Sequence, residues 1–217
     1  MTRSRLASIS GIASAALAAG GIALMSSSPG NSDEEIVSWF DDSGNRARLW
    51  IGTALFACSI LAFVWYASGL RETLRVHAGE QPAALAFGGA IVFAALALTS
   101  MALGLGIVAT IDFGSDFRVD PNTARLVETF GYLPIFAGAM ALSLTVGAAS
   151  TAARRTGIFP GWVTLPGYVL APALLLSVPL WGLPLGVFAI WVLVTSVLML
   201  RDAATEESAP SPALGSA

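Results

Sequence analysis

The chain has 217 residues, of which 55% are hydrophobic and 12% are charged, and its mean hydropathy is +0.74. A soluble domain carries roughly 25% charged residues, so this composition indicates an integral membrane protein. The single cysteine excludes a disulfide-stabilised scaffold, and the formal net charge of −3 excludes a basic nucleic-acid-binding protein. We therefore expect an all-α protein that crosses the cytoplasmic membrane of a bacterial cell several times.

Six stretches are long and apolar enough to be membrane-spanning helices, because a span needs about 20 mostly apolar residues to cover a hydrocarbon core roughly 30 Å thick. Most of the charged residues lie between these stretches or at their ends. The sequence therefore predicts a bundle of six transmembrane helices. The predicted spans are 6–25, 49–70, 83–111, 126–151, 162–180 and 184–200.

The first and the last apolar tracts need closer inspection. Segment 6–25 follows Arg3 and Arg5 and is rich in Ala, Gly and Ser, so it is either a retained anchor or a cleaved secretory signal. The last tract, 162–200, would measure roughly 58 Å as one helix, about twice the hydrocarbon thickness. It must therefore fold back, and Gly182, which lies between two prolines, predicts the position of the reversal.

The distribution of arginine predicts the orientation, because arginine is enriched in the short cytoplasmic loops of membrane proteins. An orientation with both termini inside places seven of the eleven arginines on the cytoplasmic side. We therefore predict one transmembrane domain over 1–201, and a disordered cytoplasmic tail over 202–217, which is rich in Ala, Ser, Pro and Glu. The seven are Arg3, Arg5, Arg71, Arg75, Arg154, Arg155 and Arg201.

The first outer loop contains a helix signal of its own. Ser32 followed by Glu35 has the form of a capping box, and it predicts a short helix over 33–42 that ends near Gly44. The apolar residues of this helix lie on one side, and Trp39 is of the type found at the headgroup level. The sequence therefore predicts an interfacial helix on the outer leaflet.

Acidic residues recur every four positions in the second outer loop, at Asp112, Asp116 and Asp120. On one helix they would share a face and could bind a hard cation. Gly114 and Pro121 argue against a continuous helix, so a solvated acidic loop is the favoured interpretation, and no metal site is predicted. Asp120 followed by Pro121 predicts the start of the next helix.

Glu128 is the one acidic residue inside a predicted span. Arg125 and Tyr132 lie three residues before and four residues after it, so the three side chains can meet on one helix face. They either form an interfacial ion pair capped by a tyrosine hydroxyl, or they contact a cation, proton or substrate at the mouth of an outward-facing cavity. Ionisable groups at membrane depth frequently mark such pathways.

Prolines supply the other candidate positions. Pro134 lies in the fourth predicted span, and Pro166 and Pro172 lie in the fifth. An interior proline leaves a backbone carbonyl without its helical partner, and broken helices build binding sites in some transporters. The same prolines can equally serve helix packing alone.

Enzyme signatures are absent from the sequence. It has no H-E-x-x-H, G-x-S-x-G or P-loop motif, and Cys58 has no histidine within a span to activate it. We therefore expect a protein without enzymatic activity and without a cofactor.

The C-terminal third carries a pattern of basic, aromatic and apolar residues. A basic pair, Arg154-Arg155, precedes Phe159-Pro160-Gly161-Trp162, and two apolar segments follow, the second ending at Arg201. This pattern resembles the end of uncharacterised small multi-pass membrane proteins of the actinobacterial type. The resemblance implies a helical membrane bundle and attaches no activity to any residue.

Together these features predict a protein that acts by helix packing or by partner binding within the lipid bilayer. A membrane-protein partner or a second copy of the chain would be its partner, and nucleic acid would not. The alternative is a small transporter whose site lies near Glu128 and the proline-containing fifth helix. A cavity that reaches both Glu128 and that helix would favour transport.

Overall fold

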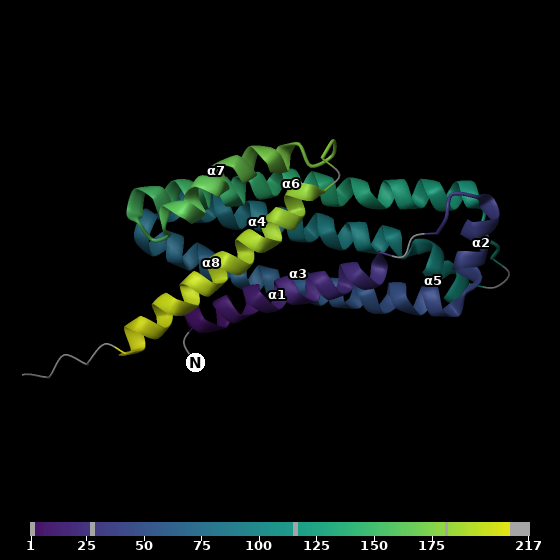
Figure 1. Cartoon of the computed structure of the whole chain (residues 1–217), viewed down its shortest axis with the longest axis horizontal. Coiled ribbons are helices and arrows are strands. Elements are labelled where there is room, and N and C mark those ends of the chain that lie inside the picture. The colour runs from purple at the N-terminus through teal and green to yellow at the C-terminus, as the bar shows by residue number, and fades with distance from the viewer. Residues whose placement is uncertain (1–2, 27–28, 115–116, 181, 209–217) are drawn as a thin grey trace, which may run out of the picture.

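The computed structural model describes residues 3–26, 29–114, 117–180 and 182–208, and all regular structure within these ranges is helical. Three long helices and a diagonal fourth dominate the elongated molecule (Figure 1). The elements are α1 (Arg3–Met25), α2 (Asp33–Asp41), α3 (Ser43–Ala78), α4 (Glu80–Gly104), α5 (Gly106–Phe113), α6 (Pro121–Thr156), α7 (Gly161–Leu175) and α8 (Leu183–Ser208).

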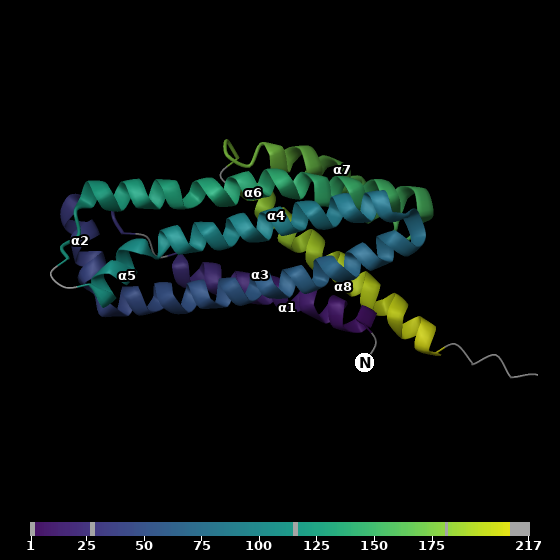
Figure 2. The same ribbon diagram turned by 180° about the vertical axis from the view of Figure 1, so that it is seen from behind.

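Helices α4 and α6 pack along each other, α1 packs along α3, and α8 crosses the bundle diagonally (Figures 1 and 2). Close approach between α4 and α6 depends on Gly89, because a Cβ atom there would lie 2.5 Å from the Ala141 carbonyl oxygen. Close beside it, the Thr145 hydroxyl donates a 2.9 Å hydrogen bond to the Ala86 carbonyl oxygen. Small residues and a hydroxyl thus bring two apolar helices together, as is usual inside a bilayer.

Within the described residues, five helices are long and apolar enough to cross a membrane: α1, α3, α4, α6 and α8. This confirms a multi-pass membrane protein. The fifth predicted span, 162–180, corresponds to α7, which has 15 residues and is followed by turns. At 1.5 Å per residue α7 measures roughly 22 Å, which is less than the hydrocarbon thickness.

The reversal was predicted near Gly182, and the structure confirms it. Gly182 has a φ of 74°, in the left-handed region that favours glycine, and α8 begins at the next residue. Successive turns around Ser177 form their own backbone hydrogen bonds, including one of 3.1 Å from the Gly182 amide to the Ser177 carbonyl oxygen. A reversal that satisfies its own backbone groups can lie at membrane depth when protein packs around it.

Two other boundaries differ from the sequence-based prediction. The predicted continuous span 83–111 is wrong, because α4 ends at Gly104 and a separate helix, α5, begins at Gly106. Leu105 joins them, and its amide still donates a helical hydrogen bond of 3.0 Å to the Met101 carbonyl oxygen. The last helix continues to Ser208, beyond the predicted domain boundary at 201, and residues 209–217 of the predicted tail lie outside the described residues.

The capping box before α2 is present. The Ser32 hydroxyl accepts a hydrogen bond from the Glu35 amide, and the Glu35 carboxylate accepts one from the Ser32 amide, at 3.2 and 3.1 Å. These bonds lower the pKa of Glu35. The helix ends at Asp41, and Gly44 does not end it, because α3 starts at Ser43.

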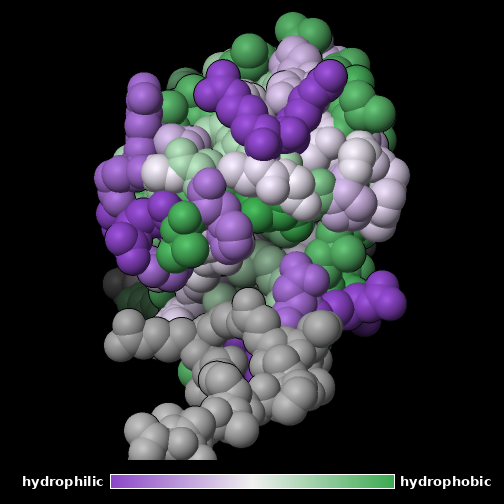
Figure 3. All heavy atoms as spheres, turned by 90° about the vertical axis from the view of Figure 1, so that its left-hand side faces the viewer, coloured by the Kyte–Doolittle hydropathy of each residue, from purple (hydrophilic) through white to green (hydrophobic). Residues whose placement is uncertain are grey.

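The apolar side of α2 faces protein. Ile36 and Phe40 are buried in a small cluster with Ile107 and Val108 of α5 and with Ala124 of α6. Helices α2 and α5 thus close one end of the bundle, beyond the end of α1 (Figure 1). Hydrophilic side chains gather at the opposite end, where α3 turns into α4 and α6 turns into α7 (Figure 3).

Candidate functional site

A cavity of about 610 Å³ lies between α1, α3, α4, α6 and the first turns of α8. Ligand sites in proteins typically have volumes of roughly 300–1,000 Å³ and mainly apolar walls with a few polar groups. Apolar residues form most of the described wall here as well. This cavity is therefore the candidate site.

The cavity exists because the α7–α8 hairpin is short. A Cβ atom on Gly182 would lie 3.7 Å from the ring of Phe136, which is the sixteenth residue of α6. The reversal therefore lies roughly 22 Å along α6 from the start of that helix, and the first turns of α6 have no α7 or α8 residue beside them. On the other side of the cavity, α1 runs beside α3 but ends at Met25, so it does not reach the N-terminal end of α3 (Figure 1).

Three aromatic rings form the inner end of the cavity. Phe63 of α3, Phe93 of α4 and Phe188 of α8 line it, and the ring centroids of Phe63 lie 5.7 Å from both of the others. The third pair, Phe93 and Phe188, is 6.3 Å apart, and all three pairs meet edge to face. Such pairs are the favoured arrangement for aromatic rings, so they make a dense, apolar floor.

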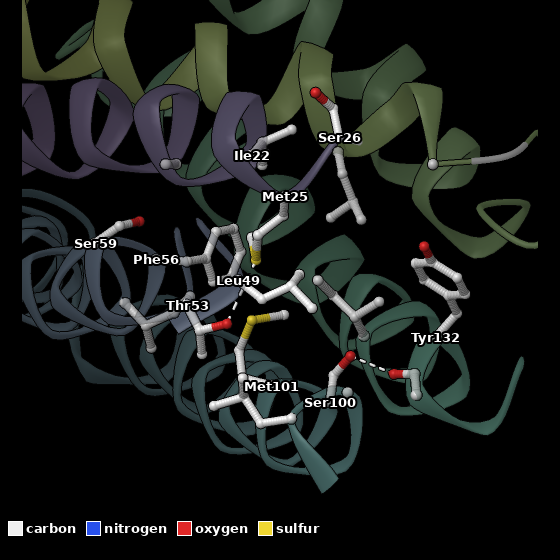
Figure 4. Close-up of a pocket in the computed structure, with 18 of the residues that line it drawn as sticks. Ile22, Met25, Ser26, Leu49, Thr53, Phe56, Ser59, Ser100, Met101 and Tyr132 are labelled. Carbon is white, nitrogen blue, oxygen red and sulfur yellow. Dashed lines mark hydrogen bonds between the residues drawn. The ribbon is translucent and has the colours of Figure 1, made fainter. Parts of the chain in front are cut away.

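Two hydroxyl groups of the side walls, those of Thr53 and Ser100, are bonded to protein. Thr53 donates to the Met25 sulfur at 3.6 Å, and Ser100 donates to the Gly131 carbonyl oxygen (Figure 4). Gly131 lies beside Gly104 of α4, because a Cβ atom there would lie 3.7 Å from the Gly104 Cα atom, an ordinary contact distance. Ser14 and Ser59 also line the cavity, and most of the other lining residues are apolar.

Glu128 is the one carboxylate among the described residues that line this cavity, and Tyr132, which also lines it, lies one turn further along α6. Both are exposed. The predicted ion pair between Arg125 and Glu128 does not form. Arg125 instead donates to the Asp33 carboxylate at 2.7 Å and to the Asn31 carbonyl oxygen at 3.0 Å. Within the described ranges, the Glu128 carboxylate has neither an ion pair nor a hydrogen bond.

A second, smaller pocket of about 230 Å³ adjoins the cavity at this end. The two share Pro29, Ala124 and Glu128, and Arg125 and Asn31 line only the smaller one. A polar compartment therefore continues an apolar one, and Glu128 lies at their junction.

The prolines do not belong to this site. Pro134 lies inside α6, and Pro166 and Pro172 lie inside α7, so the helices continue through all three positions. No described residue of α7 lines the cavity. The structure thus brings Glu128 and Tyr132 together at one cavity and leaves the two prolines of α7 apart from it.

Two of the acidic residues predicted for the second outer loop, Asp112 and Asp120, accept hydrogen bonds from protein groups. The Asp112 carboxylate accepts hydrogen bonds of 2.8 Å from the Trp50 indole nitrogen and from Arg46, and these contacts lower the pKa of Asp112. Asp120 caps α6 by accepting from the Thr123 amide and hydroxyl, which lowers its pKa too. Asp116 lies outside the described residues. Among the residues that the structure describes, no cluster of three or more metal-binding side chains occurs.

Sequence reasoning missed the aromatic floor. Phe63 is 3% exposed, whereas Leu61, two residues away, is 60% exposed, yet both are apolar residues in the same uniformly apolar helix. Hydropathy cannot distinguish a side chain that faces lipid from one that faces a cavity. The one signal in the sequence is the set of phenylalanines at positions 56, 63, 93 and 188, and nothing in the sequence separates them from Phe87, which does not line the cavity.

Comparison with known proteins found no matching family model, no matching curated protein and no matching solved structure. The functional argument therefore rests on the site itself.

Proposed function

We propose that this protein binds an amphiphilic molecule from the outer leaflet, with its hydrocarbon chain in the cavity and its polar group at Glu128. This is partner binding without enzymatic activity. The proposal rests on one observation: an apolar cavity of about 610 Å³ that ends at Glu128, a carboxylate with no partner among the described residues, and continues into a polar pocket. Lipid tails are as apolar as the cavity wall, so the binding of a chain is favoured by close van der Waals contact with that wall.

The proposed orientation has both termini on the cytoplasmic side of the cell membrane. The helices α1, α3, α4 and α6 then cross the membrane fully. The fifth and sixth predicted spans, which correspond to α7 and α8, form a hairpin that enters the membrane from the cytoplasmic side. At the end of the bundle that this orientation places in the cytoplasm, the Arg71 guanidinium lies 5.5 Å from the Phe87 ring centroid. The Arg154 guanidinium lies 6.0 Å from the Tyr168 ring centroid. Arginines beside aromatic rings suit a cytoplasmic headgroup region.

This orientation places α2 and α5 at the outer interface. Helices α3 and α6 each have 36 residues and measure roughly 54 Å, so about 24 Å of each lies outside a hydrocarbon core of 30 Å. Glu128 is the eighth residue of α6, so in this orientation it lies near the outer end of that helix, at the level of the headgroups. The cavity then extends from headgroup level toward the middle of the bilayer.

A small transporter remains the second candidate, supported by the free Glu128 carboxylate at the cavity mouth. Transport needs a route to the other side of the membrane. The aromatic floor of Phe63, Phe93 and Phe188 blocks that route in this conformation, and α7 contributes no described residue to the cavity. These features favour binding over transport.

Filling the cavity tests the proposal. Gly186 lines the cavity and has no atom within 4 Å of where its Cβ atom would lie, so Gly186→Phe adds a ring to the cavity without a backbone clash. Gly88 has the same free space but does not line the cavity, so Gly88→Phe is the matched control. Native mass spectrometry of protein purified from membranes is expected to show a bound amphiphile in the wild type and in Gly88→Phe, and a loss in Gly186→Phe. An equal amount in all three would refute the proposal.

A further inference from the structure

The electrostatics of the cavity mouth point to the charge of the ligand. Two charged side chains line the polar pocket, Arg125 and Glu128. They differ in what already neutralises them. Arg125 is 2.7 Å from the Asp33 carboxylate, whereas Glu128 has no ion pair within the part of the chain that the structure describes. The uncompensated charge at the junction of the two pockets is therefore negative.

Aromatic groups beside the carboxylate favour the same sign of ligand charge. Trp39 of α2 and Tyr132 of α6 line the cavity together with Glu128. Tryptophan and tyrosine attract cations through the negative faces of their rings. A carboxylate together with such rings matches an ammonium group and repels a carboxylate or a sulfate.

From this arrangement we infer that the ligand is a cationic amphiphile, whose ammonium group contacts Glu128 while its alkyl chain occupies the cavity. This rests on the proposed function and adds the class of the polar group. Arg125 acts differently: by binding Asp33 and the Asn31 carbonyl oxygen it joins the chain ahead of α2 to α6 and holds the polar pocket in shape.

The attraction has a limited size. Glu128 is exposed, and a charge pair at a wet site contributes about 0.2–1 kcal/mol. A cation–π contact at an exposed site adds about 0.5–1 kcal/mol. Together these predict that a cationic chain binds about threefold to thirtyfold more tightly than a neutral chain of equal length.

Competition with chains of equal length tests the inference. The full-length protein in nanodiscs of zwitterionic lipid binds a spin-labelled alkyl chain, and dodecylammonium, dodecanol and dodecanoate are titrated as competitors at pH 7. We expect dodecylammonium to displace the label at a concentration about threefold to thirtyfold lower than dodecanol, with dodecanoate weakest. In Glu128→Gln the three should become nearly equal. Glu34→Gln is the matched control, because Glu34 is an exposed acid on α2 that lines neither pocket, and it should keep the wild-type order.

The outcomes separate the two proposals. If dodecanol and dodecylammonium compete equally in the wild type, or if Glu128→Gln keeps the preference, the charge inference is wrong and chain binding stands. Tightest binding of dodecanoate would also overturn it, and would assign the polar group to Arg125. If no chain displaces the label at all, the proposed function fails together with the inference.

Discussion

At the scale of single residues, a buried hydrogen bond joins the first and last parts of the bundle. The Tyr66 hydroxyl of α3 lies 2.6 Å from the Thr195 hydroxyl of α8, and both residues are fully buried. Thr195 also lies 2.8 Å from the Trp191 carbonyl oxygen, to which its hydroxyl can donate. Tyr66 then donates to Thr195, which fixes the diagonal helix that forms one wall of the cavity.

Removing this hydroxyl should weaken the bundle modestly. We expect Tyr66→Phe to lower the free energy of unfolding by about 1 kcal/mol, the size typical of a hydrogen bond between membrane helices. Tyr168→Phe is the matched control, because no hydrogen bond to the Tyr168 hydroxyl occurs among the described residues. Unfolding in mixed micelles with increasing SDS measures both. Equal stability of the two variants would contradict the assignment.

Residue-scale predictions from sequence succeeded where the signal was local. Ser32 with Glu35, and Asp120 with Pro121, mark helix starts through backbone bonds within three residues, and both occur. The expected pairing of Arg125 with Glu128 failed because Asp33, distant in sequence, competes for the guanidinium. Spacing along one helix shows which residues can meet and leaves out partners from other elements.

At the scale of elements, the contact of α4 with α6 depends on which face of α4 lacks a side chain. A Cβ atom on Gly89 would lie 2.5 Å from a backbone oxygen and 2.7 Å from the Thr145 hydroxyl, whereas one on Gly88 would meet nothing within 4 Å. Neighbouring glycines thus have opposite surroundings, since one faces α6 and the other faces outward.

This contrast yields a matched pair of variants. We expect Gly89→Ala to destabilise the protein by about 1–3 kcal/mol, because α4 and α6 must move apart. Gly88→Ala should be neutral or stabilising by less than about 1 kcal/mol, as alanine favours the helix. Thermal unfolding in detergent measures both changes. A destabilisation of the same size in both variants would argue against close packing at Gly89.

The attachment of α5 to α3 predicts a pH dependence at the outer end. Trp50 and Arg46 hold the pKa of Asp112 below its ordinary value of 3.8. Because the folded-state pKa is the lower one, the ionised carboxylate stabilises the docked helix. That stabilisation is complete above the ordinary pKa and is lost as the pH falls through the pKa of the folded protein.

The Trp50 indole N–H resonance measures this transition, because Trp50 donates to Asp112 at 2.8 Å. Between pH 6 and pH 2 the wild-type resonance should shift in a titration whose midpoint lies below 3.8. In Asp112→Asn the resonance should stay constant, since the amide does not titrate. A midpoint above the ordinary value, or the same titration in the variant, would contradict the proposed contact.

Helix ends were harder to predict than helix positions. The predicted span 49–70 is the apolar middle of α3, which extends from Ser43 to Ala78 because polar residues continue the helix outside the membrane. The break at Leu105 lies in apolar sequence and has no proline, so hydropathy could not detect it. An apolar stretch of about 20 residues predicts where a helix crosses the membrane. The helix itself ends where a capping residue or a glycine stops it.

At the scale of the whole molecule, the orientation can be tested with single cysteines. Cys58 is exposed on α3, so it is replaced by alanine first. In intact cells we expect Glu34→Cys, on α2, to react with a membrane-impermeant maleimide, and Gln81→Cys, at the start of α4, to react only after permeabilisation. Both positions are exposed. The reverse pattern would place the N-terminus outside.

Composition predicted the class of the molecule, and the proposed orientation rests on the distribution of its arginines. The cavity could not be predicted, because it arises from the length of α7 and the position of the reversal relative to α6, which are tertiary facts. Glu128 was singled out from sequence because charge at membrane depth is rare, and it does line the cavity. The aromatic floor was hidden among lipid-facing residues of the same kind.

The most direct test of the central claim is photo-crosslinking with an alkyl chain that carries a diazirine near its end. In native-like bilayers, mass spectrometry should find labels on the cavity side of α3, at Phe56 and Phe63, and on its outward side, at Leu61 and Trp65. In Gly186→Phe the labels on Phe56 and Phe63 should disappear while those on Leu61 and Trp65 persist. Absence of cavity-side labels in the wild type, or their persistence in Gly186→Phe, would contradict binding in the cavity.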